Sequence, residues 1–322
     1  MNNIEIIKYS IDLIAVLLLA LGIKGLSKIR SARSANRLAA CAIALSILGV
    51  LVDSIITSGV SFDAWLWIII GTFTGSSLGF LIAKRVPMTA MPETVALFNG
   101  CGGMSSLLVA MGVVLFELED IPLGEVARDH IDNISIIVSI FVGAITFSGS
   151  IVAMAKLQGW LSTPSWTQSK FRHLLNIFFA AISLVGIIGI FQGFDNALWI
   201  LVAGSLFIGV GVTLSIGGAD MPVVISLLNS YSGVAAAAAG FVMKSQLLIV
   251  AGAMVGAAGL ILTQVMCNGM NRSLVSVLFG GALGASSASN GEVAEYKNIT
   301  SSSIEECALT IEASERVVVV PG

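Results

Sequence analysis

Apolar runs long enough to cross a membrane follow one another along most of the chain. They fall at about 5–25, 36–57, 62–83, 92–116, 132–156, 171–193, 196–216, 222–243 and 246–268. A helix needs about 20 mainly apolar residues to span a hydrocarbon layer of roughly 30 Å, and each run has about that length. The pattern therefore predicts an all-α polytopic membrane protein with about nine transmembrane helices.

The composition supports this fold class and narrows the chemistry. The chain is 56% hydrophobic and 11% charged, with a mean hydropathy of +0.97, whereas charged residues make up about a quarter of a typical soluble domain. No basic patch for nucleic acid is evident. The first apolar run follows acidic Glu5 and lacks a small-residue cleavage site, so we expect it to remain as a helix. The cysteines are far apart and predict neither a disulfide framework nor a metal site: Cys41, Cys101, Cys267 and Cys307.

Charges in the connections alternate along the chain and predict an orientation. Basic connections carry Lys24, Lys28, Arg30 and Arg33, then Lys84 and Arg85, then Lys156, Lys170 and Arg172. The connections between them carry acidic residues, as at 117–132. Because lysines and arginines favour the cytosolic side, the N-terminus is predicted outside and the C-terminus in the cytosol.

Two stretches 130 residues apart share one design. MPETVALFNGCGG at 91–103 and MPVVISLLNSYSG at 221–233 each begin with Met-Pro and place an asparagine seven residues after the proline, at Asn99 and Asn229. Proline suits the first turn of a helix. At 1.5 Å per residue each amide lies roughly 10 Å inside the membrane. Matched helices of this kind often form a transport path. The alternative is a pair of asparagines that only hold helices together.

A third polar group lies at the same depth. Ser150 is six residues before Lys156, hence roughly 9 Å from the boundary. A lone serine in a membrane helix usually bonds to its own backbone instead. Gly217 and Gly218, beside Asp220, would allow local movement of a cytosolic turn, although a fixed tight turn explains them equally well. No side chain is well placed at mid-membrane to carry a proton, so water or another subunit must do so.

The chain changes character after Cys267. A Gly/Ser/Asn-rich linker is followed by a capping-box pattern at Ser303 and Glu306, and the sequence Arg316-Val-Val-Val-Val ends in Pro321-Gly322. Four valines before Pro-Gly suit a buried parallel strand. We predict a transmembrane domain at 1–269, a linker at 270–298 and, at 299–322, the start of an α/β nucleotide-binding domain that stops before its glycine-rich loop.

From about residue 80 the chain resembles the membrane part of the β subunit of proton-translocating NAD(P) transhydrogenase. The stretches that carry the resemblance are MTAMPETVALFNG, AITFSGSIVAMAKL, GGADMPVVISLLNSYSGVAAAAAGF, LLIVAGAMVGAAG and MCNGMNRSLVSV. The final NITSSSIEECALTIEASERVVVVPG resembles the beginning of that family's NADP-binding domain.

The resemblance implies an enzyme of a bacterial inner membrane that transfers hydride from NADH to NADP⁺ while a proton crosses inward. It implies an α subunit with the NAD-binding domain and further membrane helices, an NADP domain continuing this chain, and a homodimer of α/β units. Asp220, Asn229, Ser150 and Arg272 match positions used in the proton path or in coupling. Some members have histidine where this chain has Asn99, which cannot titrate; others have asparagine there and place a histidine on the α subunit.

We therefore expect Asn99, Ser150 and Asn229 to line a hydrated proton path. We expect Asp220 and Arg272, with Gly217 and Gly218, to couple it to the NADP domain. No catalytic, nucleotide-binding or metal-binding residue is expected in this chain. Two rivals are a stand-alone secondary transporter, which lacks a midplane charge to bind a substrate, and a structural membrane anchor, which does not explain three polar groups at one depth.

Overall fold

The computed structural model describes residues 3–26, 28–57, 61–116, 130–164, 167, 171–194, 196–278 and 304–314. The chain divides into two compact units, Met1–Leu283 and Gly284–Gly322. Within the second unit the described part is a short helix, α11 (Ile304–Glu312). The strand expected at Val317 to Val320 lies outside the described residues.

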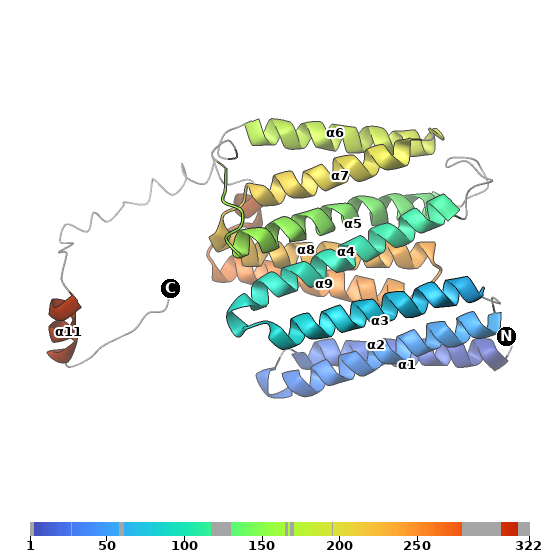
Figure 1. Cartoon of the computed structure of the whole chain (residues 1–322), viewed down its shortest axis with the longest axis horizontal. Helices are drawn as coiled ribbons and strands as arrows, with labels where there is room; N and C mark the ends of the chain where they lie inside the picture. The colour runs from blue at the N-terminus through green and yellow to red at the C-terminus, as the bar shows by residue number, and fades with distance from the viewer. Residues whose placement is uncertain are drawn as a thin grey trace. The chain divides into compact units, whose positions relative to one another are not determined.

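The first unit is a bundle of long helices, shown in Figure 1. Within the described residues nine helices are long and apolar enough to cross a membrane, and no strand is present. The sequence prediction of an all-helical membrane fold is thereby confirmed. The helices are α1 (Asn3–Leu26), α2 (Ile29–Thr57), α3 (Phe62–Arg85), α4 (Met91–Phe116), α5 (His130–Leu157), α6 (Phe171–Phe191), α7 (Ala197–Leu214), α8 (Met221–Val242) and α9 (Gln246–Gly269).

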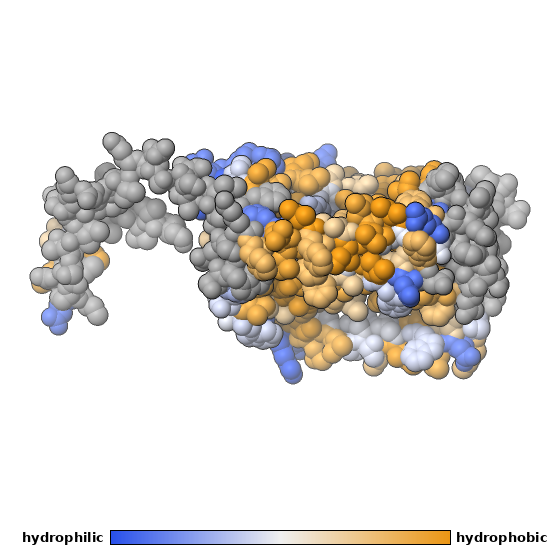
Figure 2. Space-filling model, turned by 90° about the horizontal axis from the view of Figure 1, so that it is seen from above, coloured by the Kyte–Doolittle hydropathy of each residue, from blue (hydrophilic) through white to orange (hydrophobic). Residues whose placement is uncertain are grey.

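Large apolar side chains cover the outside of this bundle, as Figure 2 shows for one face. Trp67, Phe73 and Phe80 of α3 are 71%, 73% and 66% exposed within the chain. Soluble monomers rarely expose contiguous apolar surface on this scale. A hydrocarbon solvent removes the cost of exposing it, so the surface fits a multi-pass membrane protein.

Helix α5 is the centre of the packing. It lies against α4, α7 and α8, while α8 packs along α9 and α6 packs mainly on α7 (Figure 1). Helices α1 and α2 form a pair that meets α9. None of the described residues of α3 is buried. The most deeply buried helices are therefore α5 and α8, followed by α4 and α7.

Two apolar clusters fill the bundle at different heights. One joins the later half of α4 to the first half of α5 and to α6 and α7, and includes Leu107, Ile140 and Leu201. The other joins the start of α4, the end of α5 and the start of α8, and includes Ala96 and Ala153. Residues 97–106 of α4 lie between the two clusters, and this interval contains Asn99.

Helices α4 and α8 begin in the same way. Each is preceded by a single 3-10 turn, η1 (Met88–Ala90) before α4 and η3 (Gly218–Asp220) before α8, and each has a proline as its second residue, Pro92 or Pro222. A proline here loses no intrahelical hydrogen bond, because the first N–H groups of a helix have no partner. The repeated Met-Pro design thus sets two helix starts with matching geometry.

Glycine allows the close approach of two helix pairs. A Cβ atom on Gly103 of α4 would lie 2.8 Å from Thr146 Cβ of α5, and one on Gly233 of α8 would lie 2.8 Å from the Gly252 carbonyl oxygen of α9. Real Cβ atoms essentially never come this close. Both contacts are of the small-residue kind that membrane helices use to bring their backbones together.

Candidate functional site

Asn99 lies at the centre of a polar network that joins three helices between the two apolar clusters. Its Nδ2 donates to Ser150 Oγ on α5 at 3.0 Å, and its Oδ1 accepts from Ser232 Oγ on α8 at 2.8 Å. Ser150 is 1% exposed, whereas Asn99 is only half-buried. We call Asn99, Ser150 and Ser232 the amide network. It brings together two of the three residues predicted to lie at one depth.

Asn229 reaches the network through its backbone. Ser232 Oγ lies 2.7 Å from the carbonyl oxygen of Asn229 as well as 2.8 Å from Asn99 Oδ1. A serine hydroxyl has one proton, so it donates to one of these oxygens at a time. The half-buried side-chain amide of Asn229 makes no hydrogen bond to the residues that the structure describes.

The network can hold and orient water but contains no group that titrates near neutral pH. A primary amide keeps its protons, and a serine hydroxyl exchanges its proton only through a bonded neighbour. Ser150 accepts from Asn99 and donates to no acceptor among the described residues. Its own proton is therefore available to a further acceptor.

One turn deeper along α5, a buried hydroxyl lacks a partner in the described part of the chain. Thr146 is 0% exposed, and its Oγ1 has no hydrogen bond there. Residues four apart share a helix face, so Thr146 follows Ser150 towards the bilayer centre. A buried hydroxyl without a hydrogen bond lowers the stability of the fold. In proteins an ordered water usually supplies the missing hydrogen bond.

The remaining small polar residues of α8 face α9. Ser230 Oγ donates to the Gly256 carbonyl at 2.6 Å, and Ser226 Oγ to that of Gly259 at 3.4 Å. Thr263 Oγ1 in turn lies 3.1 Å from Ser226 Oγ. The small polar residues of α8 are thus divided between packing against α9 and the amide network with α4 and α5.

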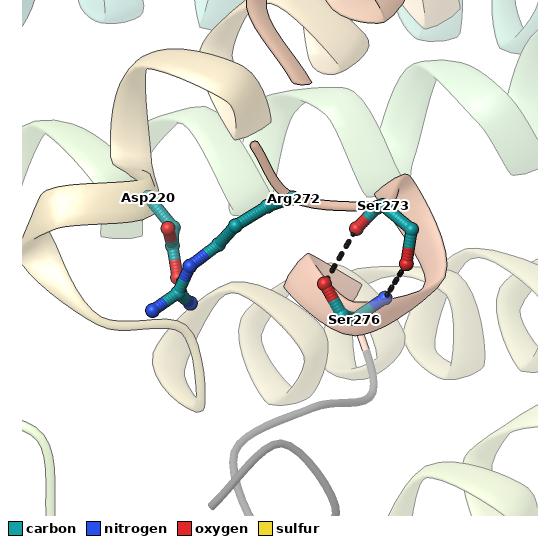
Figure 3. A network of polar contacts seen from close by, with 4 residues as sticks. All are labelled: Asp220, Arg272, Ser273 and Ser276. Carbon is teal, nitrogen blue, oxygen red and sulfur yellow. Dashed lines mark hydrogen bonds and ion pairs between the residues drawn. The ribbon is translucent and has the colours of Figure 1, made fainter. Parts of the chain in front are cut away.

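Asp220 and Arg272 are paired at the end of the bundle where α8 begins and α9 ends. Arg272 Nη1 lies 2.9 Å from Asp220 Oδ2, with side-chain exposures of 55% and 13%. Asn271 adopts a φ of 52°, and the Arg272 N–H donates to the Cys267 carbonyl at 2.9 Å. This is the Schellman ending of a helix, with asparagine in the left-handed position. It turns the chain so that Arg272 faces Asp220 (Figure 3).

Gly217 and Gly218 lie beside this ion pair in open space. A Cβ atom on either would meet no other atom of the chain within 4 Å. Gly217 has a φ of −68°, which is close to the −70° of Pro87 at the corresponding place before α4. Neither sterics nor backbone geometry within this chain therefore requires glycine at 217.

Lys156 fixes the segment that leads into this turn. Its Nζ donates to the carbonyl oxygens of Leu214 at 2.8 Å and Ile216 at 2.5 Å and to Thr163 Oγ1 at 2.9 Å. The carbonyls at the end of a helix have no intrahelical donors. Lys156 thus stabilises the end of α7 and anchors the chain just before Gly217.

Sequence reasoning missed Ser232 and Lys156 as parts of this region. Ser232 lies three residues after Asn229 and so on the same helix face, which is the signal that could have found it. In the sequence, Lys156 served only to mark the orientation and the boundary of its helix. No sequence pattern indicated its contacts, because they depend on where the end of α7 packs.

Comparisons with known proteins give one family. The family model described as NAD(P) transhydrogenase beta subunit matches residues 8–322. A protein named NAD(P) transhydrogenase subunit beta, from Rhodospirillum rubrum, is 38% identical over 313 residues, which make up 96% of this chain and 66% of the relative. A protein of the same name from a specified strain of that species gives the same values. The chain thus spans just under two thirds of the length of these relatives.

Proposed function

The chain belongs to the NAD(P) transhydrogenase beta subunit family, and from this premise we propose that it forms the proton-conducting membrane part of a proton-translocating transhydrogenase. The whole enzyme would transfer hydride from NADH to NADP⁺ while protons move inward. Residues 1–269 would form the transmembrane domain, 270–298 a linker and 299–322 the start of the NADP-binding domain. We assign no nucleotide-binding residue to this chain.

The observation that carries the proposal is the bridge made by Asn99. Its two ends bond to Ser150 on α5 and Ser232 on α8, between two apolar clusters. An amide that only joined helices would also use both of its ends, so what supports a path is that Asn99 is only half-buried and that Ser150 donates to no acceptor among the described residues. Three polar groups from three helices at one level provide several donors and acceptors for water in an otherwise apolar bundle.

The proton would cross this level on water held by the network. Asn99 orients the two hydroxyls, Ser150 presents its proton to a water, and Asn229 contributes its carbonyl and a side-chain amide that is half-buried. Coupling proton movement to hydride transfer calls for a group that binds and releases the proton at a controlled step. Asn99 cannot supply one, so we place that group on a helix of the α subunit next to the half-exposed side of Asn99.

Coupling would arise at the ion pair. If the NADP domain contacts Asp220, Arg272 and the exposed turn at Gly217 and Gly218 differently before and after hydride transfer, its state shifts the equilibrium of the path. Differential binding is the only thermodynamic route to such a shift. Lysines and arginines at this end of the bundle include Lys84, Arg85 and Lys156, which supports a cytosolic position. The N-terminus would then lie outside a bacterial inner membrane.

The decisive experiment uses the assembled enzyme, with its α subunit and NADP domain, in sealed vesicles. Asn99→Leu keeps the side-chain size but removes both hydrogen bonds and the polar surface. Asn229→Leu removes the second amide. We expect each to reduce proton translocation, followed with a pH-sensitive dye, by about 100-fold, because an apolar group interrupts a water chain at a cost of several kcal/mol.

Ser230→Ala is the matched control, since Ser230 lies on the same helix but bonds to α9. It should leave translocation close to that of the wild type. Normal proton pumping by Asn99→Leu and Asn229→Leu would reject the path. Failure of the chain to co-purify with an NAD-binding subunit would favour the stand-alone transporter instead.

A further inference from the structure

Three successive contacts between α4 and α5 differ in character on going from the amide network towards the bilayer centre. At the first, Asn99 donates to Ser150. One turn further along, a Cβ atom on Gly103 would lie 2.8 Å from Thr146 Cβ and 2.9 Å from its methyl carbon, Cγ2. Beyond that, Ser139 Oγ donates to a backbone carbonyl of α4 at 3.0 Å. Thr146 thus lies between two hydrogen-bonded contacts, on the α5 face that it shares with Ser150 and Ser139.

The hydroxyl of Thr146 has neither a hydrogen-bonding partner among the described residues nor a surface that water can touch. The residue is 0% exposed, and its Oγ1 is unpaired. Helical threonines commonly bond to the carbonyl four residues back, as Thr74, Thr94 and Thr263 do here at 2.7, 2.9 and 2.8 Å. Thr146 makes no such bond. Its hydroxyl is therefore free to bond to a molecule that enters beside it, and no other subunit can reach it.

One water would match the spacing between Thr146 and Ser150. The four residues between them rise roughly 6 Å, which is about twice the usual O–H···O distance of about 2.8 Å. Ser150 accepts from Asn99 and has its own proton to donate. A water between the two residues would accept that proton and donate to Thr146 Oγ1. It needs space that the packing does not leave while Gly103 and Thr146 are in contact.

The side of Thr146 that faces away from the amide network is closed. A Cβ atom on Gly143 would lie 2.8 Å from the Gly103 carbonyl oxygen, so the two backbones touch there. Ser139 Oγ lies 3.0 Å from a carbonyl oxygen of α4 and 3.3 Å from one of α8. Leu107 of the first apolar cluster follows along α4. A proton that has reached the amide network thus meets a dry stretch, in which Thr146 carries the first unbonded hydroxyl.

We propose that Thr146 is a gate residue of the proton path. In the conducting state α4 and α5 part at Gly103 and admit one water, which Thr146 and Ser150 hold between them. This inference rests on the proposed proton path and adds a residue to it. In the closed arrangement the hydroxyl is dry, and on opening it gains a hydrogen bond, so the hydroxyl favours opening. Thr146 positions the water and does not itself titrate.

Two substitutions separate the hydroxyl of Thr146 from its packing. Thr146→Val keeps the shape of the side chain and removes the hydroxyl, whereas Thr146→Ser keeps the hydroxyl and removes the methyl group. In the assembled enzyme in sealed vesicles, Thr146→Val should lower proton translocation by about tenfold, because the open state loses a hydrogen bond to water. The same variant should raise the unfolding temperature by a few degrees, because the closed state loses an unpaired buried hydroxyl. Thr146→Ser should keep most of the translocation although it is less stable.

Thr263→Val is the matched control, since Thr263 is 1% exposed and its hydroxyl is bonded to the Gly259 carbonyl. It should lower the unfolding temperature and leave translocation close to that of the wild type. A similar fall in the unfolding temperature of Thr146→Val would show that the hydroxyl of Thr146 is already bonded. Equal losses of translocation in Thr146→Ser and Thr146→Val would show that packing matters rather than the hydroxyl. Either result would overturn the proposal.

Asn99→Leu shows whether a failure concerns the gate or the whole path. Normal translocation by Thr146→Val beside an impaired Asn99→Leu would overturn the gate and leave the amide network in the path. Normal translocation by both variants would reject the path together with its gate.

Discussion

Asp220 and Arg272 join the turn before α8 to the turn after α9 through an ion pair of 2.9 Å. The carboxylate is mostly shielded while the guanidinium is half-exposed, so the pair is open to contact from outside the bundle. Solvent around the arginine side chain weakens the Coulomb attraction between the two charges. Exposed ion pairs of this kind contribute about 1 kcal/mol or less to the free energy of unfolding.

Arg272→Gln should therefore change the thermal stability of the complex little but alter coupling. We expect a loss of about 1 kcal/mol or less in the free energy of unfolding and a clear fall in proton-coupled turnover. Thermal unfolding and vesicle assays measure the two effects. If turnover stays normal in a stable Arg272→Gln enzyme, the ion pair has no part in coupling.

Gly217→Ala tests whether glycine is needed at this turn for the backbone of the turn itself or for close approach of the NADP domain. The open space around Gly217 and its φ of −68° predict that alanine fits without strain, and fewer unfolded conformations should stabilise the chain by up to about 1 kcal/mol. If the NADP domain approaches this turn closely, coupled turnover should fall even though the unfolding temperature does not. A fall in both would contradict the structure of the turn, and a fall in neither would remove Gly217 from the coupling surface.

Ser232→Ala and Ser230→Ala distinguish the two sides of α8. Ser232 bonds to Asn99 and Ser230 to Gly256. Each substitution removes one hydrogen bond and should cost about 0.5–1.5 kcal/mol of stability. Only Ser232→Ala should also reduce proton translocation, because it releases one end of the amide of Asn99. Equal translocation in the two variants would show that the hydroxyl of Ser232 is dispensable to the path.

Gly103→Ala and Gly102→Ala form a second matched pair. A Cβ on Gly103 would lie 2.8 Å from Thr146 Cβ, whereas one on Gly102 would meet nothing within 4 Å. We expect Gly103→Ala to cost about 1–3 kcal/mol because α4 and α5 must separate. Gly102→Ala should be neutral or stabilising by up to about 1 kcal/mol. Thermal unfolding of the purified complexes measures both, and equal stabilities would contradict the close approach.

The helices were predictable because hydrocarbon imposes a strict length and composition on whatever crosses it. The residues at which the helices begin and end were less predictable. The run expected at 36–57 begins in the structure at Ile29, so that Arg30 and Arg33 belong to α2. Hydropathy marks where a helix leaves the hydrocarbon, whereas backbone hydrogen bonding continues beyond that point through charged residues.

The contact between α4 and α5 at Asn99 and Ser150 could be anticipated from the rise of a helix, but the partner from α8 could not. Asn99 and Ser150 meet as their equal depth suggested. The bond from α8 comes from Ser232 rather than from the amide of Asn229, because partners depend on rotation about the helix axis. That rotation is set by packing against α9 through Gly233 and Gly256, which the sequence of α8 alone does not fix.

The glycine contact between α8 and α9 has a mechanical consequence. Backbones that touch at Gly233 and Gly252, with serine and threonine bonds alongside, leave no compressible side chains between them. We therefore expect the two helices to move together as one rigid unit. A displacement of the Asp220–Arg272 end would then also move Ser232, whose single proton can bond to either of two oxygens.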